Sequence, residues 1–451
     1  MMMRTITTIL LIALPLSLEA IDPDTAFNRL FRQDIGGWIA ADATYSIHLP
    51  DGRTLWLFGD TFIGEVEGVA IRNGSAFIRN SAVIQENSEL MTLHGGTPEA
   101  PDDFIKTDNP DSTWYWPEHG IVDRDTLRIL LGKFRHEDNG TPGFDFAQAG
   151  NDIASFSWPD LEFIRTEPVM AHAINGVTYG DRVLTDSDTI YIYGRRSDTA
   201  SYNIPYPHVA RTTGGNFMNQ AAWEFFDGSG WSPDPEDSRR IHDFQVSQQY
   251  SVSTYRGKYI LLTQDIWLSP DIYTFVSDSP VGPWRNKTKI YTTPETGGTT
   301  FTYNAWAHPQ FNKQNELLVS YNVNGDFWSI FSNVELYRPR FIRVPYMNLS
   351  YEFWPNQIED LPRRETEIRV WPNPAGNYTK LIVKAAPGST ISWQLMDGMG
   401  RLIDNRTGKL TAGEVNEFPI PLEDLADGIY YLRFSGLHRQ ETLRIIKSSN
   451  Y

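Results

Sequence analysis

One pattern recurs five times between about residue 36 and residue 346 and constrains the fold more than any other feature. Each unit holds a strand-like run, a turn and a more apolar run, and the units open at intervals of about 65 residues with ATYSIHL, STWYWPEHGIV, VTYGDRVL, QQYSVSTY and TYNAWAHPQF. Gly, Pro, Asn and Asp separate the runs, without a long helical period. Five such units predict an all-β five-bladed β-propeller, in which the first strand of each unit lines a central channel.

The chain after this repeat changes character twice. Residues 347–366 carry Pro and charge with little pattern and are typical of a linker, whereas 367–451 alternate like the strands of a small β-sandwich. We therefore expect a propeller over residues 21–346 and a second domain over residues 367–451.

The first twenty residues, MMMRTITTILLIALPLSLEA, are typical of a secretory signal peptide. Their apolar run is too short to span a membrane as a mature helix. The sequence contains no Cys, which excludes disulfides and thiolate catalysis. We therefore expect an exported protein that has no membrane span.

The charge and the aromatic content limit the class of partner. A net charge of −17 argues against nucleic acid as a ligand. The 14 Trp, 21 Tyr and 24 Phe suit a cleft that binds sugars, because aromatic rings stack on the C–H faces of sugar rings, although propeller cores also use aromatic residues.

Two carboxylates flank a predicted hairpin in the first unit. Pro50-Asp51-Gly52 separates two strand-like runs and favours a three-residue loop, with Gly52 in the left-handed conformation. On that register Asp42 lies directly opposite Asp60, with Cβ atoms about 4.5–5.5 Å apart. A two-residue Asp-Gly turn would shift the register and separate them. Alternatively, Asp60 only caps the turn after its strand.

An opposed carboxylate pair suits glycoside hydrolysis. One carboxylic acid protonates the leaving oxygen, and the other attacks the anomeric carbon or activates water. We expect Asp42 to be the nucleophile or base. Asp60 would then be the acid, with Trp56 and Phe58 as its apolar wall. The predicted spacing is compatible with a retaining mechanism, but side-chain rotamers could widen it to the inverting range.

Further candidates for substrate binding lie at the openings of the other units. The polar candidates are Glu118, His119, Asp181 and His308, and the aromatic ones are Trp114, Trp116, Tyr303 and Trp306. Glu118 is also an alternative acid, and strand alternation predicts that only one of Glu118 and His119 points inward. Each of these residues could instead serve the packing of the core or a turn.

The C-terminal segment resembles the type A sorting domain of the Bacteroidetes type IX secretion system. The matching motifs are VWPNPA (370–375), LMDGMGRLI (395–403), LADGIYYLRF (425–434) and IIK (445–447). The resemblance implies export across the outer membrane by the type IX secretion machinery.

The first domain resembles the five-bladed propeller glycoside hydrolases that include the endo-D-arabinofuranases, formerly a domain-of-unknown-function family. The matching segments are DATYSIHLPDGRTLWLFGDTF (42–62), FIRNSAVI (77–84), the GPW element (282–284) and YNAWAHPQF (303–311). The resemblance implies that Asp42 and Asp60 are the catalytic carboxylates, in agreement with the hairpin argument.

The sequence therefore predicts a secreted, monomeric glycoside hydrolase that cleaves furanosidic linkages in an arabinan-like polysaccharide. A non-catalytic propeller that binds glycans at the cell surface is the alternative from another class. The sequence contains no zinc-type ligand set, so no cofactor is expected. A structural Ca²⁺ in the channel stays open as an alternative, without a motif that signals it.

Overall fold

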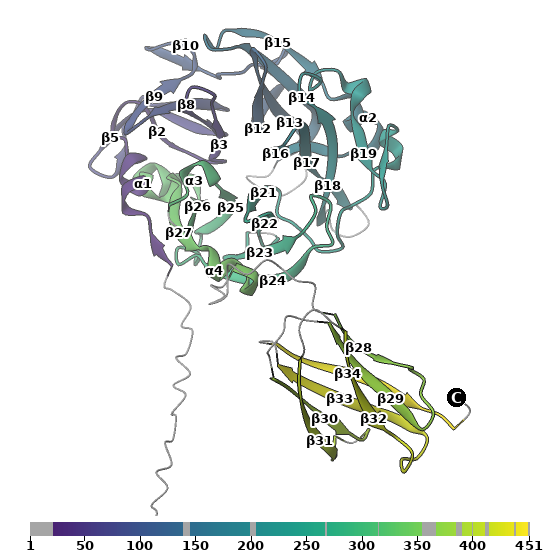
Figure 1. Ribbon diagram of the computed structural model, residues 1–451. Helices are drawn as coiled ribbons and strands as arrows, with labels where there is room; N and C mark the ends of the chain where they lie inside the picture. The colour runs from purple at the N-terminus through teal and green to yellow at the C-terminus, as the bar shows by residue number, and fades with distance from the viewer. Residues whose placement is uncertain are drawn as a thin grey trace, which may run out of the picture. The chain divides into compact units, whose positions relative to one another are not determined.

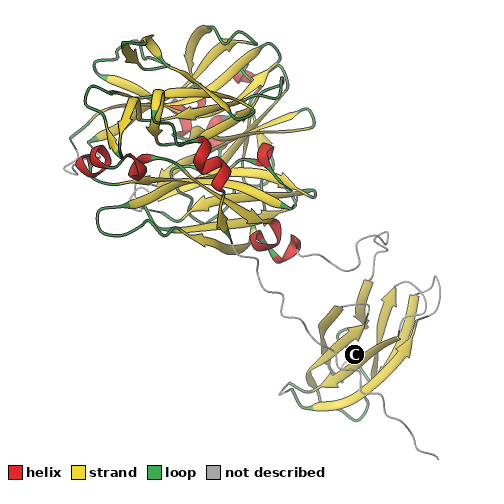
Figure 2. Ribbon diagram, turned by 90° about the vertical axis from the view of Figure 1, so that its left-hand side faces the viewer, coloured by secondary structure: helices red, strands yellow, loops and turns green. Residues whose placement is uncertain are grey.

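Strands dominate the computed structural model of the chain (Figure 2), which divides into two compact units after Trp354. The structure describes residues 21–138, 145–198, 204–266, 268–313, 315–353, 367–384, 390–398, 400–410, 415–436 and 439–449. The predicted signal peptide and residues 354–366 of the predicted linker lie outside the described residues. No helix in the described part of the chain is long and apolar enough to cross a membrane.

The five repeated units of the sequence each form one antiparallel sheet. The first sheet contains β3 (Tyr45–His48), β4 (Thr54–Phe58), β8 (Ser81–Glu86) and β9 (Glu89–Leu93). The second contains β12 (Thr113–Asp123), β13 (Thr126–His136), β14 (Phe146–Ser157) and β15 (Phe163–Pro168). The third contains β16 (Thr178–Asp186), β17 (Thr189–Asp198), β18 (Ile204–Thr213), β19 (Glu224–Phe226) and β20 (Trp231–Ser232).

The last two sheets follow the same order. The fourth contains β21 (Tyr250–Tyr255), β22 (Lys258–Gln264), β23 (Asp271–Ser277) and β24 (Arg285–Thr292). The fifth contains β25 (Phe301–Ala307), β26 (Glu316–Asn324), β27 (Arg340–Pro345) and the N-terminal β1 (Asp22–Pro23). The strand pattern predicted from the sequence is therefore confirmed sheet by sheet.

The first strands of the five sheets contact one another in chain order. β3 lies against β12, β12 against β16, β16 against β21, and β21 against β25. The rings of Tyr45 in β3 and Trp306 in β25 are 5.4 Å apart, so the fifth sheet also contacts the first. Figure 1 shows the five sheets around a common centre. Residues at the starts of the units are thereby brought together.

The hairpin between β3 and β4 has the register predicted from Pro-Asp-Gly. Tyr45 faces Leu57 and His48 faces Thr54. The Leu49 amide donates to the Arg53 carbonyl at 2.9 Å, and Gly52 has φ of 89°. This conformation is accessible to Gly because it has no Cβ. The three-residue loop is therefore confirmed, and its turn lies at the end of β3 away from Asp42.

Three of the five first strands, β12, β16 and β25, carry a bulge. The register of β12 against β13 shifts between Pro117 and Gly120, and that of β16 against β17 shifts between Tyr179 and Arg182. The register of β25 against β26 shifts between Tyr303 and Trp306. A bulge changes the direction in which side chains point. Simple strand alternation therefore fails at these candidate residues.

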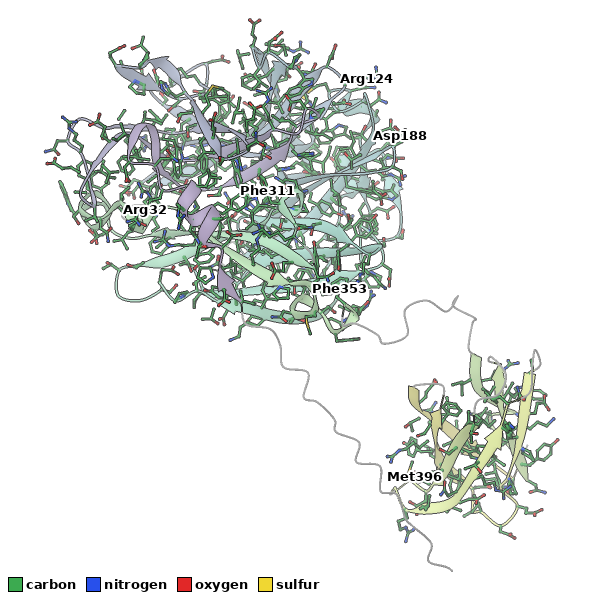
Figure 3. The ribbon with its side chains drawn as sticks, turned by 60° about the vertical axis from the view of Figure 1, so that its left-hand side comes forward. Arg32, Arg124, Asp188, Phe311, Phe353 and Met396 are labelled. Carbon is green, nitrogen blue, oxygen red and sulfur yellow. The ribbon has the colours of Figure 1, made fainter. Side chains whose placement is uncertain are left out.

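The N-terminal segment is attached to the last sheet. Asp24 caps α1 (Thr25–Leu30), and its carboxylate accepts from Arg343 of β27 at 2.6 Å. Phe27 of α1 contacts Phe311, with ring centroids 4.9 Å apart. Figure 3 labels Phe311 on the first unit. The start of the described chain therefore packs against its fifth sheet.

Additional elements lie outside the five sheets. β2 (Ile35–Ala41), β5 (Thr61–Glu67), β6 (Ala70–Ile71) and β7 (Ala76–Ile78) form a further small sheet, and β10 (Gly95–Thr97) pairs with β11 (Ala100–Asp102). The short helices are α2 (Met170–Asn175), α3 (Phe327–Ser332), α4 (Tyr346–Leu349), η2 (Gln220–Ala222), η3 (Pro235–Asp237), η4 (Pro309–Phe311), η5 (Val334–Tyr337) and η6 (Tyr351–Phe353).

The boundary of the predicted linker differs from the structure. Residues 347–353 form parts of α4 and η6, and Leu349 and Phe353 are buried in the core shared by β22, β26 and β27. These residues belong to the first unit. The sequence showed no strand pattern there, because short helices bury only isolated side chains.

The second unit contains two sheets. One consists of β28 (Glu367–Trp371), β29 (Tyr378–Lys384) and β32 (Val415–Pro421). The other consists of β30 (Thr390–Met396), β31 (Leu402–Lys409), β33 (Gly428–Gly436) and β34 (Arg439–Lys447). Trp393, Leu381, Leu432 and Phe434 belong to one buried cluster that draws on both sheets.

Candidate active site

Asp42 and Asp60 meet where two strand ladders join. β2 ends at Ala41, which pairs with Thr61 at the start of β5, and the β3–β4 hairpin lies on the other side. The Asp42 amide donates to the Asp60 carbonyl at 3.3 Å, and the Asp42 carbonyl accepts from Gly59 at 3.1 Å. The backbones of Asp42 and Asp60 therefore lie side by side, beyond the last pair of the β3–β4 ladder.

Gly59 gives the Asp42 carboxylate the space that it occupies. A Cβ at this position would lie 2.4 Å from Asp42 Oδ1 and 3.5 Å from the ring of Trp116. Ala43 and Thr44, which follow Asp42, have φ of 73° and 63°. Positive φ is unfavourable for residues with a Cβ, and such strain concentrates at functional sites.

The Asp42 carboxylate binds to tyrosine hydroxyls. Tyr303 Oη donates to Asp42 Oδ2 at 2.7 Å, and Asn324 Nδ2 donates to Tyr303 Oη at 2.9 Å. The Tyr337 hydroxyl also bonds the carboxylate. Asp42 remains half-buried, with part of its surface open. Its position is thus fixed by groups from the fifth sheet and from η5.

Asp60 has a different set of partners. Trp116 Nε1 donates to Asp60 Oδ1 at 2.8 Å. An Arg79 guanidinium nitrogen lies 3.2 Å from Asp60 Oδ2, and the guanidinium lies 4.6 Å from the centre of the Trp114 ring. The side chain of Asp60 is 16% exposed, so a ligand can still reach it. Asp60 is therefore the member of the pair that contacts a cation.

These surroundings give the two carboxyls different tendencies to ionise. Burial, and then the charge of Asp60, raise the pKa of Asp42 to about 7. Burial also raises the pKa of Asp60, but Arg79 and the indole of Trp116 act in the opposite direction. Arg79 therefore favours the negative charge on Asp60, whereas the raised pKa of Asp42 favours the proton on Asp42.

This charge distribution is the reverse of the roles expected from the sequence. The apolar wall expected beside Asp60 is also absent, because Trp56 and Phe58 lie fully buried in another cluster, with Trp38 and Phe31. Residues 56, 58 and 60 alternate onto one face of an ideal strand, but β4 ends at Phe58. The chain then turns Asp60 toward Trp116 and Arg79.

Of the eight other predicted site residues, three lie at or beside the pair. Trp116 and Tyr303 each donate to one carboxylate, and Trp114 packs against Arg79. The remaining five are interior residues, with exposed fractions of 4% or less: Glu118, His119, Asp181, Trp306 and His308. Their burial does not fit the substrate-binding role that the sequence suggested.

Glu118 and Asp181 bind to one buried arginine. Arg195 donates to Glu118 Oε1 at 3.0 Å and to Asp181 Oδ1 at 2.7 Å, and Tyr45 Oη donates to Glu118 Oε2 at 2.7 Å. Both carboxylates occupy the bulges of β12 and β16 described above. They hold the innermost strands of the first three sheets together.

Both members of the Glu118–His119 pair are buried, because the bulge interrupts the alternation of β12. The Val183 amide donates to His119 Nδ1 at 3.0 Å, so the hydrogen is on Nε2, which lies 3.0 Å from the Ser46 carbonyl. Burial and Arg182 hold the pKa of His119 well below its usual range. His119 is therefore a neutral core residue.

His308 is also a core residue. Its ring nitrogens contact Ser46 Oγ at 2.6 Å and Ser320 Oγ at 2.8 Å. Burial and Arg182 keep its pKa well below the usual range. Among the described residues, no group of three or more His, Asp and Glu side chains could hold a metal ion.

The sequence did not identify three residues of the site: Arg79, Tyr337 and Asn324. Arg79 was visible as a cation between the apolar residues of FIRNSAVI. Tyr337 and Asn324 carry no local signal, because Tyr337 reaches Asp42 and Asn324 reaches Tyr303 only through the packing around the fifth sheet.

Comparison with known families identifies both parts of the chain. Residues 24–357 match the model of a family described as "Domain of unknown function (DUF5005)". The chain belongs to this family. Residues 369–448 match the secretion system C-terminal sorting domain, which confirms the sorting domain expected from the C-terminal motifs. Among curated proteins, none matches the chain.

Several solved structures are similar to this DUF5005 protein. A protein from Bacteroides ovatus, described provisionally as a hydrolase, has a TM-score of 0.59 and 24% identity, over 72% of this chain and 89% of that one. An exo-β-1,3-galactanase from Phanerochaete chrysosporium has a TM-score of 0.40 and 11% identity, over 92% and 97%. A xylan β-1,4-xylosidase from Bacillus halodurans has a TM-score of 0.40 and 9% identity, over 91% and 90%. The first of these likenesses shows a shared fold.

Proposed function

We propose that this protein is a secreted glycoside hydrolase that cleaves furanosidic linkages in an arabinan-like polysaccharide, with Asp42 and Asp60 as its catalytic carboxylates. The main support for the proposal is that the adjacent, partly exposed carboxyls of Asp42 and Asp60 have different surroundings. Asp42 binds to tyrosine hydroxyls and has a pKa raised to about 7, whereas Asp60 contacts Arg79. An acid and an anion side by side are what glycoside hydrolysis requires.

The geometry supports a definite assignment of roles. Asp42 gives its proton to the glycosidic oxygen as the bond to the anomeric carbon breaks. Asp60, held ionised by Arg79, attacks that carbon or takes a proton from the water that attacks it. If Asp60 attacks, water then cleaves the bond between the sugar and Asp60 and gives a proton back to Asp42. If Asp60 acts as the base, it holds the proton of the attacking water, and exchange with solvent returns a proton to Asp42 and removes one from Asp60.

We also propose a fold for each of the two units. Five sheets whose first strands meet suit a closed five-bladed propeller, with the carboxyl pair at one end of the channel. The two sheets of the second unit suit a small β-sandwich. Export would begin with the signal peptide of residues 1–20 and end with type IX secretion through the sorting domain, to the cell surface or the medium.

A panel of polysaccharides tests the activity. The protein without residues 1–20 is incubated with arabinans, arabinogalactans and fructans, and new reducing ends are measured. Asp60→Asn serves as the matched control, since it keeps the shape of the side chain. We expect release from an arabinan by the unmodified protein alone. Absence of release from every polymer contradicts the proposal, and binding without release favours the glycan-binding alternative.

A deletion tests the export route. The variant that lacks residues 367–451 should accumulate in the periplasm, because it has lost the sorting domain. Cell fractionation followed by immunoblotting measures the distribution. Unchanged delivery to the outside of the cell would contradict the route.

A further inference from the structure

A cleft lies near the candidate active site. It forms between α3 and the β5–β6 hairpin and has a volume of about 520 Å³. Its lining includes the polar residues Glu67, Arg72, Asn73 and Ser332 and the aromatic residues Trp328 and Phe331. The cleft is open to solvent and is thus available to a ligand.

The exposure of Trp328 is unusual for its type. The residue is 77% exposed, and its neighbour Phe327 is 53% exposed. Trp is among the residues that gain most free energy when they leave water. A large ring presented on a short helix, beside polar groups, has the composition of a ligand-binding surface.

Aromatic contacts connect this cleft to the carboxyl pair. Phe331 of the cleft lies 6.1 Å from Phe62, ring to ring, and Phe62 lies 5.9 Å from Tyr337, whose hydroxyl bonds Asp42. Phe62 also follows Asp60 closely in the chain.

The length of β5 limits the distance between Asp60 and the cleft. The Arg72 amide donates to the Glu65 carbonyl at 2.9 Å. Glu65 follows Asp60 by five residues, a stretch that spans at most about 18 Å. An oligosaccharide of a few units covers such a distance.

We propose that this cleft, which we call the Trp328 cleft, binds a sugar residue of the polysaccharide several units away from the bond that is cleaved. The inference rests on the proposed function and extends it to the recognition of long chains. The indole of Trp328 stacks on the sugar ring, and Asn73, Glu67 and Ser332 supply hydrogen-bonding groups to its hydroxyls.

Charge favours a neutral sugar over an anionic ligand. The one cation of the cleft lining, Arg72, forms an ion pair with Glu65, and Glu67 adds a negative charge. The chain as a whole has a net charge of −17. An anionic polymer would therefore be repelled, whereas a neutral glycan needs only stacking and hydrogen bonds.

Removal of the Trp328 ring tests the inference. Trp328→Ala should lower kcat/KM on arabinan about tenfold, which corresponds to about 1.4 kcal/mol, and should leave kcat/KM on a short aryl arabinofuranoside unchanged. Trp328→Phe should recover part of the loss. Phe163→Ala is the matched control, because Phe163 is 55% exposed on a different sheet and should affect neither substrate. Equal losses on both substrates, or none on either, overturn the inference.

A binding measurement separates this inference from the proposed activity. Affinity electrophoresis in gels that contain arabinan, arabinogalactan or inulin compares Asp60→Asn with Asp60→Asn/Trp328→Ala. We expect one polymer to retard the first protein and to retard the second less. If a polymer is bound through Trp328 but is never cleaved, the result contradicts the proposed hydrolase activity and supports the proposed sugar-binding role of the Trp328 cleft. Equal retardation of the two proteins, or no retardation by any polymer, overturns the proposal that the Trp328 cleft binds sugar.

Discussion

Arg79 contacts Asp60 at 3.2 Å, and this ion pair distinguishes the two carboxyls of the site. Asp42 has tyrosine hydroxyls as partners instead, and the nearby charge that raises its pKa is that of Asp60 itself. In a coupled pair the cation determines which member ionises first. The acid and the anion of the proposed mechanism are assigned on this ground.

Activated substrates distinguish the roles of the two carboxyls. Asp42→Asn and Asp60→Asn should each lower turnover on arabinan by several orders of magnitude. A leaving group of low pKa needs little protonation, so an activated aryl arabinofuranoside should restore activity to Asp42→Asn but not to Asp60→Asn. Steady-state kinetics on both substrates provide the measurement. Rescue of Asp60→Asn instead would reverse the assignment.

Loss of the Arg79 charge should shift the pH profile. Without the cation the pKa of Asp60 rises, so the acidic limb of kcat/KM should move upward by about one pH unit. Arg79→Gln makes this change, and Arg79→Lys should keep the original limb. Arg211→Gln, on the third sheet and paired with Glu224, is the control. An acidic limb that stays in place in Arg79→Gln would show that Asp60 is not the ionised group.

Asp42 should make the folded state less stable as the pH rises. Its pKa is about 7 in the folded protein and has a usual value of 3.8. Between these values the folded state binds the extra proton, so the free energy of unfolding falls as the pH increases from about 4 to 7. Asp42→Asn should remove this dependence and stabilise the protein at pH 8 by about 1–3 kcal/mol. Urea unfolding across pH, with exposed Asp160→Asn as control, measures it.

A methyl group at Gly59 should disable the site without unfolding the protein. The new Cβ would lie 2.4 Å from Asp42 Oδ1, so the carboxylate must move. We expect a loss of turnover of at least about 100-fold with a melting temperature close to that of the parent. Gly150→Ala is the matched control, since its nearest neighbour would be 3.7 Å away. Wild-type activity in Gly59→Ala would show that the position of Asp42 is unimportant.

The buried network should affect stability more than chemistry. Arg195→Met leaves Glu118 and Asp181 without their cation and should cost about 3–5 kcal/mol of unfolding free energy. Glu118→Gln should retain turnover within about tenfold, since Glu118 is buried and bonds Tyr45 and Arg195. Denaturant curves and turnover numbers are compared for both variants. A folded Glu118→Gln protein with turnover reduced 1,000-fold would restore Glu118 as the acid.

The sequence by itself determined the features that depend on local interactions. Pro50 and Gly52 set the hairpin loop and the register of β3 against β4, and Asp42 and Asp60 lie beside each other just beyond the last pair of that ladder. The five strand units and the sorting motifs are likewise properties of short segments. Turn chemistry and strand alternation act over a few residues, so they can be read without the fold.

Only the tertiary structure decided which carboxyl has a cation beside it. Arg79 reaches Asp60, and Tyr303 and Tyr337 reach Asp42, through the packing of sheets whose residues are far apart in the chain. The bulge at Glu118 and His119 turned both side chains into the core, against strand alternation. A pKa depends on burial and on every nearby charge, and these are fixed only when distant segments pack together.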